Sequence, residues 1–210
     1  MSSLFSRPLD AVTNLSSVSG GGAAGVSPTF GAALWTMDYS LRATYSNMSR
    51  TYFHHGTVGN CQYCFWGRYS MGAPYYGATA AVALLAGASH LTALDAGNTN
   101  YAAYATFDAD GAPLRVLLYN SDYYAGSGTR SSTSFTLSGL TGSGVKAKRL
   151  TAGSASSRQD QGDVLTFGGQ TFTDGTCAIA GTESYEETSV SGGQATFTLK
   201  ATEVLLVYLQ

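Results

Sequence analysis

A chain of 210 residues is long enough to bury a hydrophobic core, as one large domain or two small ones. Charged residues make up only 11% of it, against roughly a quarter in ordinary globular domains, which indicates a secreted or wall-associated protein more than a cytosolic one. The formal net charge of -2 supplies no basic face for a phosphate backbone, which argues against a nucleic acid partner.

No part of the sequence is suited to crossing a membrane. The longest apolar run, residues 78–88, is Ala-rich and falls short of the ~20 residues that a spanning helix needs, so it predicts a buried core helix. Residues 1–7 lack the apolar stretch that follows the basic end of a signal peptide. We therefore expect no membrane partner, and either an unusual export route or a true start upstream of Met1.

The N-terminal residues predict a loop followed by a helix. Residues 16–25 are a loop by composition, because Ser, Gly and Ala dominate them. Ser27 is predicted to cap a helix that has Pro28 in its first turn and ends near Tyr45. The apolar side chains that support this helix are Phe30, Leu34, Trp35, Met37, Tyr39 and Leu41.

A β-prone run at residues 50–54 and a second helix at residues 76–89 flank a long loop. The second helix is predicted to bury Ala81, Leu84, Leu85 and Ala88. A loop, a helix, a strand, a loop and a helix in this order are typical of a β/α-barrel near its end. The sequence therefore predicts that residues 1–89 are the remnant of the C-terminal end of such a barrel.

Beyond Leu91 the sequence changes to short strands separated by Gly and Asp turns. Residues 101–107 alternate, residues 108–113 form a turn, and residues 114–120 return as the second arm of a hairpin. Further strands are predicted at residues 132–137, 145–150, 164–167, 170–173, 184–190, 194–199 and 202–209. Residues 90–210 are thus predicted to form an antiparallel β-sandwich whose last strand is central and covered on both faces. The predicted fold class is mainly β, a sandwich preceded by an incomplete β/α-barrel segment with two helices.

One segment, residues 51–76, concentrates the side chains that could bind a ligand. It holds two of the three His, two of the three Cys, one of the two Trp and five of the 14 Tyr. Asn60, Gln62, Tyr63 and Trp66 suit a sugar site, because amides and phenols bind hydroxyls and carboxylates while an aromatic face packs on the ring. The alternative is that Tyr63 and Trp66 only pack the loop onto the sandwich.

Two blocks rich in glycine and aromatic residues carry a resemblance to a known family. They read Gly-Gly-Gly-Ala-Ala-Gly-Val-Ser-Pro-Thr-Phe-Gly-Ala-Ala-Leu-Trp-Thr-Met-Asp-Tyr at residues 20–39 and Tyr-Phe-His-His-Gly-Thr-Val-Gly-Asn-Cys-Gln-Tyr-Cys-Phe-Trp-Gly at residues 52–67. With the ending Glu-Val-Leu-Leu-Val-Tyr-Leu at residues 203–209, they resemble glycoside hydrolase family 79, the β-glucuronidases and relatives of fungi and bacteria. The resemblance covers nearly the whole chain after Val18. It implies the end of a (β/α)8 barrel joined to a C-terminal β-sandwich.

The family's chemistry is retaining hydrolysis of β-glucuronosyl or similar bonds, which needs two carboxyl groups roughly 5 Å apart. By the resemblance, the nucleophilic Glu falls on Asn14, and the acid/base belongs to an earlier strand that this chain lacks. The chain has no Glu before Glu183, and the acids ahead of the central loop are Asp10 and Asp38. Asp38 lies in a predicted helix, away from the strand ends where barrel chemistry occurs. We expect no catalytic residue and no activity from this chain alone, so whether it is an enzyme stays open.

The resemblance implies that the loop after the last barrel strand recognises a uronate through Gly59, Asn60 and Tyr63, and we add His54 and Trp66 as substrate-binding candidates. His54 and His55 either line a sugar pocket at the strand end, or are a hydrogen-bonded core histidine and a solvated one. The expected partner is a glucuronide-type glycan, if the barrel is completed, with no cofactor and no metal. The alternative function is a non-catalytic secreted β-sandwich module that binds carbohydrate or packs on a partner domain.

Cys61 and Cys64 form a Cys-x-x-Cys pair without the βαβ context of a redox site or the second pair of a zinc site. A local disulfide is the expectation in an oxidising compartment, with two free thiols as the alternative. Cys177 is expected to be unpaired and buried. Asn14 and Asn47 begin Asn-x-Ser glycosylation sequences, which support the extracellular location of the family.

The charged residues cluster at two places. Lys146, Lys148 and Arg149 are the one group of cations that stands out. Glu183, Glu186 and Glu187 form an acidic cluster late in the sandwich, which we interpret as a solvated strand edge.

Overall fold

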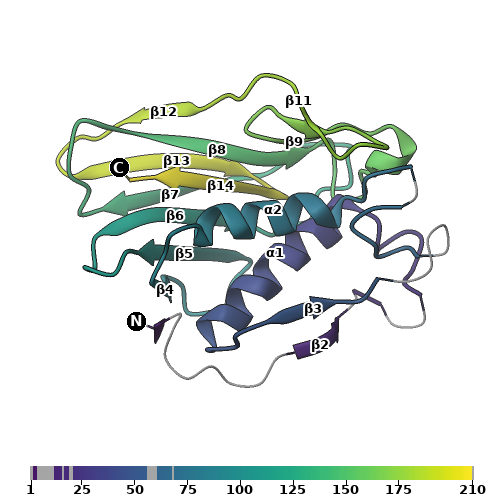
Figure 1. The fold of residues 1–210 in the computed structure, drawn as a ribbon. Helices are drawn as coiled ribbons and strands as arrows, with labels where there is room; N and C mark the ends of the chain where they lie inside the picture. The colour runs from purple at the N-terminus through teal and green to yellow at the C-terminus, as the bar shows by residue number, and fades with distance from the viewer. Residues whose placement is uncertain are drawn as a thin grey trace.

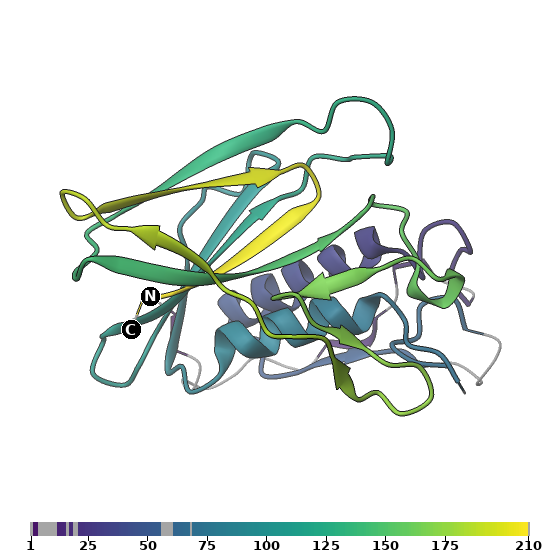
Figure 2. The ribbon, with the colours of Figure 1, turned by 90° about the horizontal axis from the view of Figure 1, so that it is seen from above.

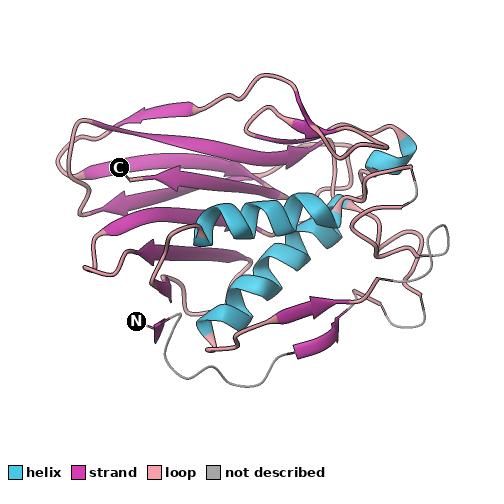
Figure 3. Ribbon diagram, in the orientation of Figure 1, coloured by secondary structure: helices cyan, strands magenta, loops and turns pink. Residues whose placement is uncertain are grey.

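The computed structural model describes residues 2–3, 12–15, 17–18, 21–55, 61–67 and 69–209. In chain order the elements are β1 (Ser2–Ser3), β2 (Val12–Leu15), α1 (Phe30–Tyr45), β3 (Thr51–Phe53), α2 (Pro74–Leu85), β4 (His90–Ala93), β5 (Tyr101–Phe107), β6 (Pro113–Asn120), β7 (Ser132–Ser138), β8 (Gly144–Ala152), a 3-10 turn η1 (Gln159–Gln161), β9 (Leu165–Phe167), β10 (Thr171–Phe172), β11 (Ile179–Ala180), β12 (Glu186–Ser189), β13 (Gln194–Lys200) and β14 (Glu203–Tyr208). Figure 3 distinguishes the helices from the strands by colour.

An eight-stranded antiparallel sheet is the centre of the fold (Figure 1). Its strands follow the order β1-β4-β5-β6-β14-β8-β12, and β9 pairs with the last part of β8. The strand β14 lies between β6 and β8, and its residues from Glu203 to Val207 are buried. The prediction that the chain ends in a central strand covered on both faces is therefore confirmed.

The two faces of this sheet have different covers, as Figure 2 shows. The helices α1 and α2 pack on one face through a core that includes Leu34, Tyr76 and Leu206. The ribbon of β7 and β13 packs on the other face, where Phe197 and Leu205 belong to a second core. The fold is mainly β with antiparallel strands and two helices, as predicted. The first core joins residues on both sides of the proposed division at residue 89, and that division stays a prediction.

The helix α1 begins two residues later than predicted. Its cap is Thr29, whose side-chain oxygen accepts a hydrogen bond from the backbone N–H of Ala32. The predicted cap, Ser27, is wrong because its hydroxyl is engaged one turn earlier, where it accepts from the N–H of Ala23 at 2.9 Å. The helix ends at Tyr45 as predicted, and Asn47 follows in the left-handed region with φ 65°, a conformation that Asn tolerates after a helix.

The helix α2 runs from Pro74 to Leu85 instead of from Tyr76 to Ser89. Pro74 occupies the first turn, where its missing N–H costs nothing, and Gly87 turns the chain with φ 69°. Gly77 faces α1 so closely that a Cβ atom there would lie 1.8 Å from the carbonyl oxygen of Ala33. A glycine is therefore required where the two helices meet.

The strands β2 and β3 form a separate parallel pair, with Val12 opposite Thr51 and Leu15 opposite Phe53. The helix α1 connects them, so β2, α1 and β3 make one βαβ unit. Only β3 of this pair was predicted, because the residues around β2 carry no clear hydrophobic period. The same unit is the repeating element of β/α-barrels.

Candidate functional site

The candidate site starts at the carboxyl ends of the two parallel strands. The backbone N–H of His54 donates to the carbonyl of Leu15 at 2.7 Å, which continues the pairing of β3 with β2. His54 and His55 then leave the strand end, and both are exposed. Ligand-binding side chains of β/α proteins gather at this end of parallel strands.

The segment of residues 61–72 is held against this strand end at several points. A disulfide joins Cys61 to Cys64, and the N–H of Gln62 donates to the carbonyl of Gly21 at 3.2 Å. Trp66 and Met71 form an isolated antiparallel bridge. The N–H of Met71 also donates to Oδ1 of Asp174 at 2.6 Å, which fixes this segment to the turn between β10 and β11.

Tyr63 is buried between the strand end and the glycine-rich loop. Its side chain is 9% exposed, and its ring centroid lies 5.6 Å from that of His54. A Cβ atom at Gly22 would come within 2.9 Å of Cδ1 of Tyr63, and Gly22 has φ 86°. Gly22 thus makes room for the tyrosine ring, a role that the loop-like composition of this segment did not reveal.

His55 and Trp66 form a second ring pair beside the first. Their centroids lie 4.4 Å apart, and Trp66 is 46% exposed. The N–H of Phe65 donates to Nε2 of His55 at 3.2 Å, which requires that nitrogen to be unprotonated. Burial lowers the pKa of His55, and the neighbouring His54 lowers that pKa further, so the neutral imidazole is favoured at neutral pH.

A chain of aromatic contacts connects this region to the two helices and to β10. Phe53 contacts Trp35 at 6.0 Å and Phe65 at 5.3 Å, and Phe65 contacts Trp66 at 6.3 Å. Trp66 in turn meets Tyr75 of α2, whose ring lies 4.8 Å from that of Phe172 in β10. Phe65, which the sequence did not single out, is the central contact of this chain.

The structure brings His54, Tyr63 and Trp66 together at one strand end. Gly59 and Asn60 lie outside the described residues, so their place in uronate recognition stays a prediction. Asn14 belongs to β2, next to the same strand end, and its side chain also lies outside the described part. Asn47 lies in the turn after α1, and its glycosylation stays a prediction as well.

Asp38 points away from this region. Its carboxylate accepts a hydrogen bond from the hydroxyl of Tyr104 in β5, and it lies 3.9 Å from Nε of Arg42. Burial raises the pKa of Asp38 above its ordinary value. Arg42 also binds Asp95 at 2.6 Å, so these groups tie α1 to the central sheet.

Two cavities adjoin the site. One, of about 400 Å³, is lined mainly by apolar surface and includes Val26, Trp35 and Tyr123. The other, of about 350 Å³, lies between residues 61–72 and Arg158, which pairs with Asp160. Sequence reasoning missed Arg158, because nothing in the pattern relates it to a loop some 90 residues earlier.

The remaining observations concern metal ligands, membrane-spanning helices and the third cysteine. Among the described residues, no three His, Cys, Asp or Glu side chains are grouped so that they could hold a metal ion. No helix in the same part of the chain is long and apolar enough to cross a membrane. Cys177 is exposed, contrary to the prediction, because it lies in the turn between β10 and β11 with φ 57°.

Comparison with known proteins identifies relatives of this chain. Residues 103–206 match the family model described as the glycosyl hydrolase family 79 C-terminal beta domain. A β-glucuronidase of Aspergillus niger is 41% identical over 73 residues, which cover 31% of this chain and 13% of that enzyme.

Solved structures extend the match to most of the chain. A 4-O-α-L-rhamnosyl-β-D-glucuronidase from Fusarium oxysporum 12S, in complex with Rha-GlcA, is 56% identical with a TM-score of 0.90. The match covers 92% of this chain and 42% of the Fusarium enzyme. An arabinofuranosidase shares the fold alone, with a TM-score of 0.59 at 11% identity over 97% of this chain and 43% of its own. The chain thus spans less than half the length of these relatives.

Proposed function

This chain belongs to glycoside hydrolase family 79 and corresponds to the C-terminal part of the family's proteins. From this we propose that residues 51–72 form one wall of a site for a β-linked uronic acid residue. The observation that carries the proposal is the 56% identity to the Fusarium glucuronidase over 92% of this chain. The arrangement of rings and hydrogen bonds at the end of β2 and β3 supports it.

Each side chain of the wall has a role that its geometry suits. The half-exposed indole of Trp66 offers an apolar face to a sugar ring. Tyr63 is held in one place by His54 and Gly22 and supplies a phenol for the uronate carboxylate. His55 supports Trp66 in its neutral form, because its Nε2 already accepts a hydrogen bond. His54, Gly59 and Asn60 complete the proposed contacts.

The parent activity is retaining hydrolysis of β-glucuronosyl or similar bonds, and this chain alone is catalytically incomplete. In the proposed mechanism two carboxyl groups face each other across the scissile bond. The nucleophile position falls on Asn14, whose amide cannot attack an anomeric carbon as a carboxylate does. The sequence has no Glu before Glu183, and Asp38 serves the contact between α1 and the sheet. In this account residues 1–89 are the last part of a barrel whose remaining strands would supply the opposite wall.

The proposed location is extracellular. A disulfide at Cys61 and Cys64 suits an oxidising compartment, and the low content of charged residues agrees with it. Attachment of N-glycans at Asn14 and Asn47 belongs to the same proposal. The comparisons do not favour the alternative of an independent sandwich module, since the matched sandwich is a defined part of the hydrolase.

The activity claim is tested with an aryl β-glucuronide and the purified chain. We expect no release of the chromophore above the rate without protein, and the same result for Tyr63→Phe. Release that is lost on Tyr63→Phe would show that the chain is catalytically complete after all. Release that survives this substitution, and co-purifies with the chain, would contradict both the incompleteness and the role of Tyr63.

A further inference from the structure

A second group of aromatic and charged side chains lies on the central sheet where α2 ends. The guanidinium of Arg115 donates to the carbonyl oxygens of Leu84 at 3.4 Å and Ala86 at 2.6 Å, so it marks the end of the helix. From Arg115 a row of paired residues crosses four neighbouring strands, with Tyr208 on β14, Lys146 on β8 and Glu187 on β12. Directly paired residues of antiparallel strands share a face, so these four side chains lie beside one another past the helix end.

Tyr185 adds a second ring to this row. Its centroid lies 5.9 Å from that of Tyr208, and the two rings are inclined by 70°, so they form a corner. The ammonium groups of Lys146 and Lys148 lie 4.7 Å and 5.1 Å from the centroid of Tyr185. Tyr185 is 37% exposed and Lys146 is exposed, so the corner is open to solvent.

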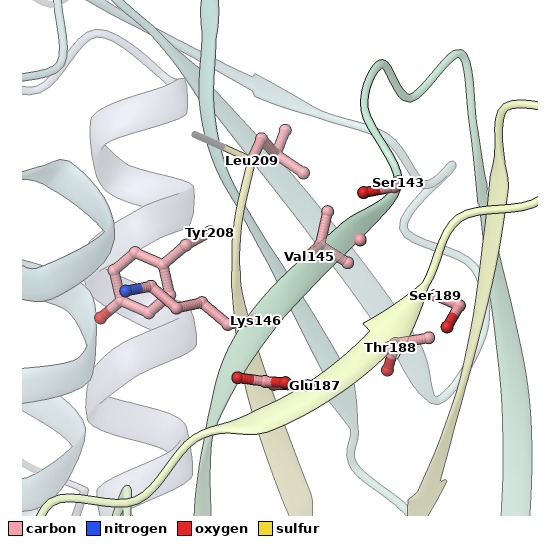
Figure 4. Close-up of a pocket in the computed structure, with 9 residues that line it drawn as sticks. Ser143, Val145, Lys146, Glu187, Thr188, Ser189, Tyr208 and Leu209 are labelled. Carbon is pink, nitrogen blue, oxygen red and sulfur yellow. The ribbon is translucent and has the colours of Figure 1, made fainter.

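The corner borders a cavity of about 630 Å³ (Figure 4). The lining includes Lys146, Glu187, Thr188, Ser189 and Tyr208. Figure 4 shows the side chains of Tyr208 and Lys146 directed toward the helices, with Thr188 and Ser189 on the neighbouring strand. On the sheet face of Tyr208, the cavity therefore offers an aromatic surface, the ammonium of Lys146, the carboxylate of Glu187 and the hydroxyl of Ser189.

The charges of this group are not all satisfied internally. Lys148 forms an ion pair with Glu183, and Arg149 pairs with Glu186 and Glu203. Lys146 forms no ion pair with any of the residues that the structure describes. Its exposed ammonium is therefore available to an anion from outside the chain.

From this geometry we propose that the cavity beside Tyr185 and Tyr208 binds a uronic acid residue of an acidic glycan. The sugar's apolar face packs on the ring corner, and its carboxylate binds the ammonium of Lys146. The hydroxyls of the sugar donate to Glu187 and exchange hydrogen bonds with Ser189, which shares the face of Glu187 on β12. A neutral sugar would leave the ammonium unused, and inorganic phosphate would leave the rings unused, so neither ligand accounts for the whole arrangement.

This site goes beyond the proposed function and does not depend on it. It lies on the β8–β12 part of the sandwich sheet, contains no residue of the loop 51–72, and requires no barrel strand. In a glycosidase such a site would hold a second part of the acidic polymer while another part occupies the reaction site.

The test is titration of the purified 210-residue chain, followed by amide resonances in nuclear magnetic resonance spectra. The probes are a β-1,4-linked glucuronic acid trisaccharide, the isosteric neutral cellotriose, and inorganic phosphate. We expect the acidic trisaccharide to shift the amides of Lys146, Glu187 and Tyr208. Lys146→Met, which keeps the aliphatic stem, should raise the Kd about tenfold, since a charge-assisted hydrogen bond is lost. Tyr185→Leu should raise it about fivefold through loss of ring packing.

The matched controls separate this site from others. Lys200→Met removes the same charge from an exposed position on β13 and should leave the Kd unchanged. Tyr63→Phe alters the proposed reaction-site wall and should also leave it unchanged, so the two proposals fail separately. The dispersion of the same spectra shows whether each variant is folded. Equal binding of cellotriose or phosphate, a folded Lys146→Met variant with the parent's Kd, or no shift of these amides at millimolar trisaccharide would overturn the proposal.

Discussion

Replacing Glu203 with Gln is predicted to destabilise the sandwich strongly. The carboxylate of Glu203 accepts hydrogen bonds from Nη1 of Arg149 at 2.6 Å, from Thr151 at 3.0 Å and from the backbone N–H of Lys200 at 3.0 Å. Its side chain is only 6% exposed, and Nη2 of Arg130 lies 3.7 Å away. An amide at this position removes the carboxylate that faces Arg130 and one of the two carboxylates that face Arg149.

The expected loss follows from the kind of contact that is broken. Removing one partner of a buried ion pair costs about 3–5 kcal/mol. The charge of Arg149 stays partly neutralised, because Glu186 also binds it at 2.6 Å. We therefore expect the lower end, about 3 kcal/mol in the free energy of unfolding. For a domain of this size that is a fall of roughly 6–12 °C in Tm.

The assay is urea unfolding followed by circular dichroism, with Tm measured in parallel. Glu183→Gln is the matched control. It removes an exposed carboxylate that pairs with Lys148, the neighbour of Arg149 on β8. The control should leave the Tm where it is. A Glu203→Gln variant within about 0.5 kcal/mol of the parent would refute the reasoning, since surface substitutions alone stay within that limit.

Three further predictions concern the helices and the parallel pair of β2 and β3. Gly77→Ala should lower the free energy of unfolding by about 1–3 kcal/mol or more in urea titrations, because its Cβ would meet the Ala33 carbonyl, whereas Gly25→Ala, with open space around it, should change little. Burial raises the pKa of Asp38, so its contribution to stability is present below its ordinary pKa and is lost as the pH rises through the raised value. Asp38→Asn should therefore gain stability relative to the parent as the pH rises above the ordinary pKa of Asp, and a difference in urea midpoints that does not vary with pH would contradict this. Among the described residues, β2 and β3 pair only with each other. Their unpaired edges should make the isolated chain poorly soluble or dependent on a partner, so a sharp two-state melt of a soluble monomer would contradict that expectation.

Local patterns were enough to predict most strands of the sandwich. Residues 101–107 alternate and occupy β5 with the predicted bounds, and the apolar run of residues 203–207 is the buried centre of β14. The short strands β4 and β11 were missed because two to four positions show no measurable period. Other short strands, such as β9 and β12, lie within predicted runs. The end of α2 was predicted four residues too late, since the Ala-rich sequence continues while Gly87 turns the backbone.

The residue types of the candidate site were predictable from the sequence, but the distant residues that hold them in place were not. The concentration of His, Cys, Trp and Tyr in residues 51–76 was enough to predict His54, Tyr63 and Trp66 as candidates. Their positions depend on distant parts of the chain, such as Gly22 beneath Tyr63 and Asp174 at Met71. A single sequence does not show which of these separated residues meet, because the pairing is fixed by the tertiary fold.

The central claim is that residues 51–72 belong to a glucuronidase site that lacks its nucleophile. The most direct measurement is hydrolysis of an aryl β-glucuronide by a chimera that joins the upstream part of the Fusarium glucuronidase to this chain. The chimera should be inactive with Asn14 and should become active with Asn14→Glu, and Trp66→Ala should weaken that activity. A chimera that is fully active with Asn14, or a folded Asn14→Glu chimera that binds substrate without hydrolysing it, would contradict the account.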